Sequence, residues 1–173
     1  MVAPISEDSV LGVITHSAEQ TFRFGRRLGC LLHAGDVVCL EGELGSGKTC
    51  LVQGIGSGLG VLGPVRSPTF VLINEYPPAS VGLWLYHVDL YRIDSAEAVG
   101  VGLEEYLYGD GVTVIEWAER AKEVMPPERL WITLSHLNYA KRRLVFEAVG
   151  DRYREIGNAL RREVSALVDR RDV

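Results

Sequence analysis

One short stretch constrains this chain more than any other part of its sequence. Residues 42–49 read Gly-Glu-Leu-Gly-Ser-Gly-Lys-Thr, a complete match to the pattern G-x-x-x-x-G-K-[ST]. Glycines let the backbone curl so that several N–H groups point at one anion. A helix that begins at the same place adds the positive end of its dipole. The stretch therefore predicts a loop that holds nucleotide phosphates, with Lys48 reaching the β- and γ-phosphates and the Thr49 hydroxyl binding Mg²⁺.

The residues around this loop agree with that interpretation. An apolar run at 37–40 precedes it and predicts a buried strand, and residues 48–59 can form the helix that follows. Three glycines in the second half of that helix weaken it, so the pattern does not fix where it ends. We expect nucleotide contacts from the whole loop and from the residue after it. These residues are Gly42, Glu43, Leu44, Gly45, Ser46, Gly47, Lys48, Thr49 and Cys50.

Further segments show patterns typical of regular structure. They are a helix over 17–34, an antiparallel pair of strands at 70–76 and 83–88, short helical pieces within 95–108, a strand at 112–115 and a hairpin of strands at 129–137 and 142–149. Ser17 opens the first helix with Gln20 at the reciprocal capping position, and Gly35 is interpreted as its stop. Strands and helices that alternate around a glycine turn predict an α/β fold. We expect the three-layer P-loop NTPase architecture, with a mainly parallel, mixed central sheet flanked by helices.

The length and composition set the domain organisation. A chain of 173 residues, 47% of them hydrophobic, suits one compact core. We expect a single P-loop ATPase domain over residues 1–150 and a helical C-terminal extension over 151–173. Apolar residues form a helical stripe on that extension, and it either packs on the body or binds a partner. The stripe consists of Tyr153, Ile156, Leu160, Val164 and Leu167.

Charge and cysteine content narrow the class of protein. A net charge of −5 argues against a chain that coats nucleic acid by itself, although a local basic patch or an RNA held by a partner stays possible. The three cysteines lack metal-like spacing and are interpreted as free thiols, which fits a reducing compartment. Residues 1–13 do not resemble a secretory signal, and no apolar run is long enough to span a bilayer. We therefore expect a cytoplasmic location.

Two acidic residues are candidate partners of the phosphate loop. Glu116 follows the strand predicted at 112–115, and Asp89 follows the strand predicted at 83–88. Each would lie at the carboxyl edge of the sheet, where α/β proteins bind their ligands. On the pattern alone either acid can be the Mg²⁺ ligand, and the other would then orient or deprotonate an attacking water.

The tripeptide Ser67-Pro68-Thr69 is a third candidate element. Pro68 holds Ser67 extended and stiffens a loop whose hydroxyls can face the γ-phosphate, as switch loops do. An ordinary turn explains the same residues, so the sequence leaves both interpretations open.

Four motifs together resemble one protein family. They are the loop at 42–49, Ser67-Pro68-Thr69-Phe70, His87-Val88-Asp89-Leu90-Tyr91-Arg92 and Ile115-Glu116-Trp117. In order and spacing they resemble the TsaE (YjeE) family, the bacterial ATPase of tRNA N6-threonylcarbamoyladenosine biosynthesis. The resemblance covers about residues 17–149. Glu43 and Ser46 stand where that family more often has Asp and Ala, which leaves the loop intact.

The resemblance implies roles for the residues around the γ-phosphate. Thr49 and Glu116 would bind Mg²⁺, and Asp89 would serve the hydrolytic water. Thr69 would belong to the switch-like loop, and Lys48 would act on the transferred phosphate. We take Asp89, Lys48 and Thr69 as the candidate catalytic residues.

It also implies contacts further along the nucleotide. Trp117 would lie near the nucleotide, and the turn that begins at Ser17 would pass the adenine, with Ala18 as a backbone contact. A basic residue of the turn at 141–143 would also reach the nucleotide. We name Arg142, although the hairpin register leaves open which residue of the turn it is.

The activity implied by the resemblance depends on partners. Family members hydrolyse ATP with Mg²⁺ weakly when alone, and act with the TsaD/TsaB heterodimer in modifying adenosine 37 of ANN-decoding tRNAs. The tRNA would be bound through that heterodimer. The role of residues 151–173, the turnover rate and the oligomeric state do not follow from the sequence.

Two other functions share the phosphate loop. The first is a small-molecule kinase of the nucleoside type, but no Arg-rich lid segment is found between Gly58 and Gly109. The second is a nucleotide-gated binding module that hydrolyses little and signals by its bound state. Added nucleosides would stimulate ADP release from a kinase, and single-turnover hydrolysis with and without partners separates a module from an enzyme.

Overall fold

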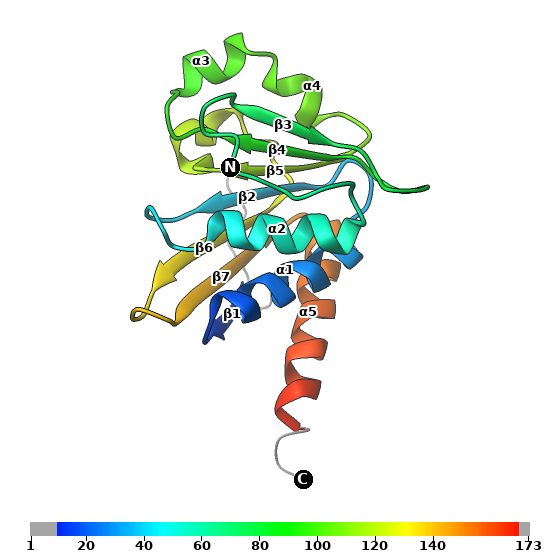
Figure 1. Ribbon diagram of the computed structural model, residues 1–173, viewed down its shortest axis with the longest axis vertical. Coiled ribbons are helices and arrows are strands. Elements are labelled where there is room, and N and C mark those ends of the chain that lie inside the picture. Colours follow the sequence, from blue (N-terminus) through cyan, green and yellow to red (C-terminus); the bar gives the residue numbers. More distant parts are fainter. Residues whose placement is uncertain (1–9, 170–173) are drawn as a thin grey trace.

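A computed structural model of the chain describes residues 10–169, and the side chains of residues 10–162. A seven-stranded sheet, in the order β1-β7-β6-β2-β5-β4-β3, forms the centre of the described part (Figure 1). The strands are β1 (Val10–Thr15), β2 (Val37–Glu41), β3 (Ile73–Tyr76), β4 (Leu85–Asp89), β5 (Val112–Glu116), β6 (Arg129–His136) and β7 (Arg142–Val149). Strands β6, β2, β5 and β4 are parallel neighbours. Strands β1, β7 and β3 join antiparallel, so the predicted α/β fold with a mixed sheet is confirmed.

Helices cover both faces of this sheet and complete three layers. They are α1 (Ala18–Leu31), α2 (Lys48–Leu59), α3 (Ser95–Gly100), α4 (Leu103–Leu107), the 3₁₀ helix η2 (Ala118–Val124) and α5 (Asp151–Asp169). Successive side chains of a strand point to opposite faces, and β2 shows this directly. Val38 and Leu40 pack in the core beneath α1 and α2, whereas Cys39 packs in the core beneath α3, α4 and η2.

Helices α1 and α2 lie closer together than side chains normally allow. A Cβ atom placed on Gly54 would lie 2.1 Å from the Phe22 carbonyl oxygen, and one on Gly29 would lie 2.3 Å from the Ile55 carbonyl oxygen. The glycines therefore permit backbone-to-backbone packing. Two of the three glycines that lower the helix propensity of α2, Gly54 and Gly58, are the residues that let it pack on α1. Helix α2 continues to Leu59.

The first helix begins as predicted and ends earlier. The Ser17 side chain accepts a hydrogen bond from the Gln20 N–H, while the Gln20 side chain accepts from the His16 N–H. The helix ends at Leu31, because Leu32 already has extended backbone angles. The stop predicted at Gly35 is wrong: Gly35 lies in the following turn, and its N–H donates to the Gly111 carbonyl.

The strands also differ from the sequence analysis, and the one predicted at 83–88 runs from Leu85 to Asp89. Residues 70–72, predicted to begin a strand, form a turn instead, because the Val71 and Leu72 N–H groups both donate to the Pro68 carbonyl. Leu72 has a φ of 74° in that turn, which no extended strand contains. Strand β1 was not predicted. It pairs along its length with β7 and leaves alternate side chains exposed.

Helix α5 begins on the body of the protein. Tyr153, Ile156 and Leu160 are buried in the core beneath α1, and the Tyr153 hydroxyl accepts from the Val37 N–H at 2.8 Å. Val164 and Leu167 of the predicted stripe lie outside the described side chains. None of the described helices is long and apolar enough to cross a membrane.

Candidate nucleotide site

The phosphate loop connects β2 to α2 in the conformation that its sequence predicts. Gly42, Gly45 and Gly47 all have positive φ angles, which residues other than glycine rarely adopt. Gly42 also lies so close to the end of β6 that a Cβ atom there would be 2.4 Å from the Leu134 carbonyl oxygen. The loop is therefore shaped by glycine and pressed against the sheet, with α2 beginning at Lys48 directly behind it.

The Lys48 ammonium lies inside the loop. It donates to the Gly42 carbonyl and, at 3.0 Å, to the Glu43 carbonyl. It also lies 3.9 Å from the centre of the Trp117 ring. Burial lowers the Lys48 pKa, and the negative charges of Glu116, Glu119 and Asp89 oppose that decrease. Phosphate oxygens would replace weak carbonyl acceptors with charged ones.

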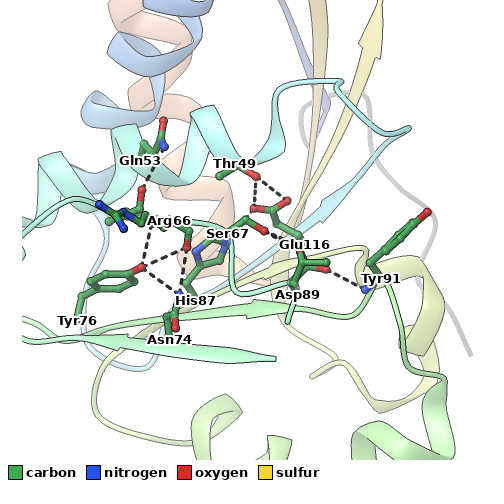
Figure 2. Close-up of polar contacts among 12 residues, drawn as sticks. Thr49, Gln53, Arg66, Ser67, Asn74, Tyr76, His87, Asp89, Tyr91 and Glu116 are labelled. Carbon is green, nitrogen blue, oxygen red and sulfur yellow. Dashed lines mark hydrogen bonds and ion pairs between the residues drawn. The ribbon is translucent and has the colours of Figure 1, made fainter. Parts of the chain in front are cut away.

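Thr49 and Glu116 meet beneath the loop. The Thr49 hydroxyl lies 2.9 Å from Glu116 Oε1 and 3.1 Å from Oε2 (Figure 2). Asp89, the other candidate metal ligand, has no hydrogen bond to Thr49 among the described residues. The pair fits Mg²⁺, which usually binds one or two carboxylates, phosphate oxygens and water. The described residues contain no cluster of three or more His, Cys, Asp or Glu suited to a metal.

Asp89 instead holds the candidate switch loop. Its Oδ2 accepts from the Thr69 hydroxyl at 2.7 Å and from the Ser67 hydroxyl at 3.1 Å. Its Oδ1 accepts from the Tyr91 N–H at 2.9 Å. Asp89 and Glu116 are register partners on the parallel strands β4 and β5. The two acids therefore lie side by side at the carboxyl edge of the sheet, as the sequence predicts, but they have different neighbours.

The start of the switch loop is fixed by three further side chains (Figure 2). The Gln53 amide on α2 donates to the Val65 carbonyl at 3.1 Å. The Tyr76 hydroxyl accepts from the Arg66 N–H at 2.9 Å, and the Asn74 amide donates to the Arg66 carbonyl at 3.2 Å. The backbone before Ser67 is thereby attached to α2 and β3.

These elements enclose a cavity of about 240 Å³. Its lining contains most of the predicted site residues, from both the phosphate loop and the acid-bearing strands. The lining residues are Leu44, Gly45, Gly47, Lys48, Thr49, Cys50, Ser67, Thr69, Asp89, Tyr91, Glu116 and Trp117. Trp117 has a φ of 60° and packs on the Tyr91 ring, with the ring centres 4.9 Å apart.

The residues predicted to contact the nucleoside lie beside the other end of the loop. The Cys50 thiol donates to the Ala18 carbonyl at 3.2 Å, which brings the α1 turn next to the start of α2. Burial is the main reason that the Cys50 pKa is raised. Arg142 Nε lies 3.8 Å from the position that a Cβ atom would take on Gly47. Ala18 and Arg142 are therefore close to the loop, although neither lines the cavity.

Several polar residues at the site have no individual signal in the sequence. His87 Nε2 lies 2.9 Å from Glu116 Oε1. His136, the register partner of Arg142, has Nε2 3.9 Å from the position of a Cβ atom on Gly45. Glu119 is partly buried, which raises its pKa. The motif at 87–92 contained the only sequence indication of His87, and nothing indicated the other two.

Comparisons with known proteins agree with this arrangement. Residues 15–144 match the model of a family described as "Threonylcarbamoyl adenosine biosynthesis protein TsaE". The chain is 40% identical over 148 residues to the tRNA threonylcarbamoyladenosine biosynthesis protein TsaE of Bacillus subtilis. The aligned region covers 86% of this chain and 92% of that protein. The protein of the same name from Streptomyces coelicolor is 48% identical over 108 residues, covering 61% of this chain and 72% of that protein.

A solved structure shares the fold. The crystal structure of YdiB from Bacillus subtilis superposes with a TM-score of 0.76 at 37% sequence identity, over 89% of this chain and 95% of that one. Sequence and structure thus lead to the same group of proteins over most of the described chain. The chain belongs to the TsaE family.

Proposed function

We propose that this protein binds ATP with Mg²⁺ and hydrolyses it in the biosynthesis of N6-threonylcarbamoyladenosine at position 37 of ANN-decoding tRNAs. The observation that carries the proposal is the contact between Thr49 and Glu116 directly beneath a complete phosphate loop. The names of the similar proteins, from Bacillus subtilis and Streptomyces coelicolor, support the pathway.

The chain's own groups have separate tasks in this proposal. The N–H groups of residues 42–50 and the Lys48 ammonium bind the phosphates. Thr49 and Glu116 would hold Mg²⁺, which supplies positive charge to the β- and γ-phosphate oxygens when it is bound. Trp117, Ala18 and Arg142 would contact the rest of the nucleotide.

Asp89 and Thr69 are proposed to act on the attacking water. The Asp89 carboxylate, however, lies within hydrogen-bond distance of the Ser67 and Thr69 hydroxyls and accepts from the Tyr91 N–H. Each hydroxyl that donates to the carboxylate occupies a lone pair that a water would need. Asp89 would therefore need to release a hydroxyl of the switch loop before it can orient or deprotonate water.

This arrangement supports slow hydrolysis by the chain alone. It also favours, as a second candidate, a nucleotide-gated module whose switch loop reports the bound state. We propose the TsaD/TsaB heterodimer as the partner, as the family resemblance implies. The net charge of −5 supports a division of labour in which the heterodimer binds most of the tRNA.

The test is ATP turnover measured with tRNA modification in the same reaction. We expect ADP release to rise when the TsaD/TsaB heterodimer and tRNA are added to the chain with ATP and Mg²⁺. Asp89→Asn should keep ATP affinity within a few-fold, and should lower stimulated hydrolysis by on the order of 10²–10⁴, the usual contribution of a positioned general base.

Each other outcome has a clear meaning. Full modification without ADP release would favour the gated module over the hydrolase. Loss of ATP and Mg²⁺ binding in Asp89→Asn would place Asp89 among the metal ligands. If added nucleosides stimulate ADP release and the heterodimer does not, the result would favour a kinase.

A further inference from the structure

His87 lies in the middle of β4, and the function proposed above does not use it. Its side chain is fully buried, with 0% exposed, and it points to the same face of the sheet as Asp89, two residues later. Glu116, on the neighbouring strand β5, is 3% exposed. The His87 ring and the Glu116 carboxylate meet at 2.9 Å, between Nε2 and Oε1.

The chemistry of this contact fixes which atom donates. A carboxylate oxygen only accepts hydrogen bonds, and a bare nitrogen lone pair at this distance would repel it. We therefore assign the hydrogen to Nε2, because Glu116 binds Mg²⁺ only as a carboxylate. The other ring nitrogen, Nδ1, is buried and has no hydrogen-bond partner among the described residues. Within the described part of the chain, Glu116 is thus the single polar partner of this ring.

His87 contacts Glu116 on the side that faces the protein core and not the cavity. Thr49 and Glu116 line the cavity, whereas His87 does not. Oε1 accepts from both His87 and Thr49, and Oε2 accepts from Thr49 alone. His87 therefore restrains one oxygen from behind, and Oε2 keeps more of its lone pairs available to the cavity.

We propose that His87 is a positioning residue for Glu116: its Nε2–H fixes the carboxylate in the orientation that binds Mg²⁺ beside Thr49. This inference rests on the proposed function. A residue that orients a metal ligand typically contributes about 10- to 100-fold to metal affinity. The same range is expected for His87, in the part of nucleotide binding that depends on Mg²⁺.

A purely structural role predicts something different. A histidine that only fills the core is replaced best by an apolar residue of similar size. A histidine that positions Glu116 is replaced best by a side chain with an N–H in the place of Nε2. Glutamine supplies such a donor, and leucine supplies volume without one, so the two substitutions separate the roles.

The experiment titrates the full chain with ADP at a series of Mg²⁺ concentrations and in EDTA. Wild type is expected to bind ADP more tightly with Mg²⁺. His87→Leu should lose about 10- to 100-fold of the Mg²⁺ affinity while binding in EDTA stays within a few-fold, and His87→Gln should recover most of that loss. The control is Thr113→Val on β5, which removes a buried hydrogen bond from Thr113 to the Tyr106 carbonyl without touching Glu116. It should keep the wild-type Mg²⁺ affinity.

The outcomes separate this inference from the proposed function. If wild type shows no gain with Mg²⁺, the metal site is refuted and both proposals fail. If Mg²⁺ raises the ADP affinity of wild type and of folded His87→Leu equally, only the inference about His87 is overturned. The inference is also overturned if the Mg²⁺ affinity of His87→Gln is as low as that of His87→Leu. Should His87→Leu not fold, His87→Asn takes its place, because its amide is one methylene shorter and does not reach Oε1.

A second measurement needs neither metal nor nucleotide. Long-range proton–nitrogen NMR spectra report which nitrogen of each imidazole carries hydrogen. The ligand-free chain should show His87 with its hydrogen on Nε2. A neutral ring with its hydrogen on Nδ1 would contradict the contact on which the inference rests.

Discussion

The two sides of the cavity are held by different kinds of contact. The phosphate side, which consists of residues 42–49 and α2, packs the fully buried Leu51, Val52 and Ile55 into the core and presses its backbone onto α1. The switch side, which consists of residues 65–72 and the ends of β4 and β5, is held by hydrogen bonds that polar side chains make with its backbone and with one another. Its Phe70 side chain is 86% exposed.

This difference explains how one site can be both rigid and responsive. Burial of apolar surface stabilises the phosphate side whether or not a ligand is present. A single hydrogen bond contributes only about 1 kcal/mol net, because water or a ligand can replace its partner. The switch side can therefore change partners at small cost, while the phosphate side keeps its shape. Three substitutions test this division.

The largest effect is expected from Gly54→Ala. A Cβ atom there would meet backbone atoms of α1, with the Phe22 carbonyl oxygen at 2.1 Å, so the helices must separate. We expect a loss of about 3 kcal/mol or more in the free energy of unfolding, at the upper end for overpacking. Urea denaturation measures it. Gly100→Ala is the control, because a Cβ atom there has nothing within 4 Å. Equal stability of the two variants would show that the phosphate side is not rigidly packed.

Lys48→Ala should remove nucleotide binding without comparable damage to the fold. The Lys48 ammonium is the positively charged group of the loop, and it donates to the Gly42 and Glu43 carbonyls. Without it, ATP affinity should fall by on the order of 100-fold, as expected for lost charge-assisted contacts. Titration calorimetry measures the affinity, and Lys122→Ala, whose ammonium lies over Trp131, is the control. Wild-type affinity in Lys48→Ala would refute the phosphate site.

The smallest effect is expected from Thr69→Val, and it should stay local. Asp89 would lose one of its two hydroxyl donors and keep Ser67. Hydrogen exchange at the Val71 and Leu72 amides, which donate to the Pro68 carbonyl, should become about 5-fold faster. Global stability should change by less than about 1 kcal/mol. Ser80→Ala, in an exposed turn, is the control. A large global loss would show that the switch side also supports the core.

The sequence predicted the phosphate side better than the switch side for a physical reason. Strand β2, the glycine loop and α2 follow from signals within a few residues of each other. On the switch side, strand β5 and Glu116 also follow from a local signal, an apolar run that ends on an acid. The turn at 70–72 instead depends on distant partners, because Asp89 holds Thr69 and the Asp89 N–H donates to the Leu72 carbonyl. No local pattern in that apolar stretch distinguishes it from a strand.

Contacts across the sheet had the weakest sequence signal. The position of each acid after an apolar strand predicted that Asp89 and Glu116 would both lie at the carboxyl edge of the sheet. It did not predict which of them meets Thr49, since that depends on where α2 crosses the strands. The contact of His87 with Glu116 likewise depends on the register between β4 and β5. Strand β1 was missed because it pairs only with β7 at the edge of the sheet and leaves half of its side chains in solvent.

The glycine contact between α1 and α2 has a consequence for the length of the ligand. Ala18 begins α1 and Thr49 lies in the first turn of α2, so the contact makes the two positions parts of one stiff body. In the proposed binding mode, this body fixes the spacing between the adenosine end and the β-phosphate end of the nucleotide, and the spacing is the same for a diphosphate and a triphosphate. On the opposite wall, Thr69 and Asp89 share a hydrogen bond for which an oxygen of the terminal phosphate would compete in that binding mode.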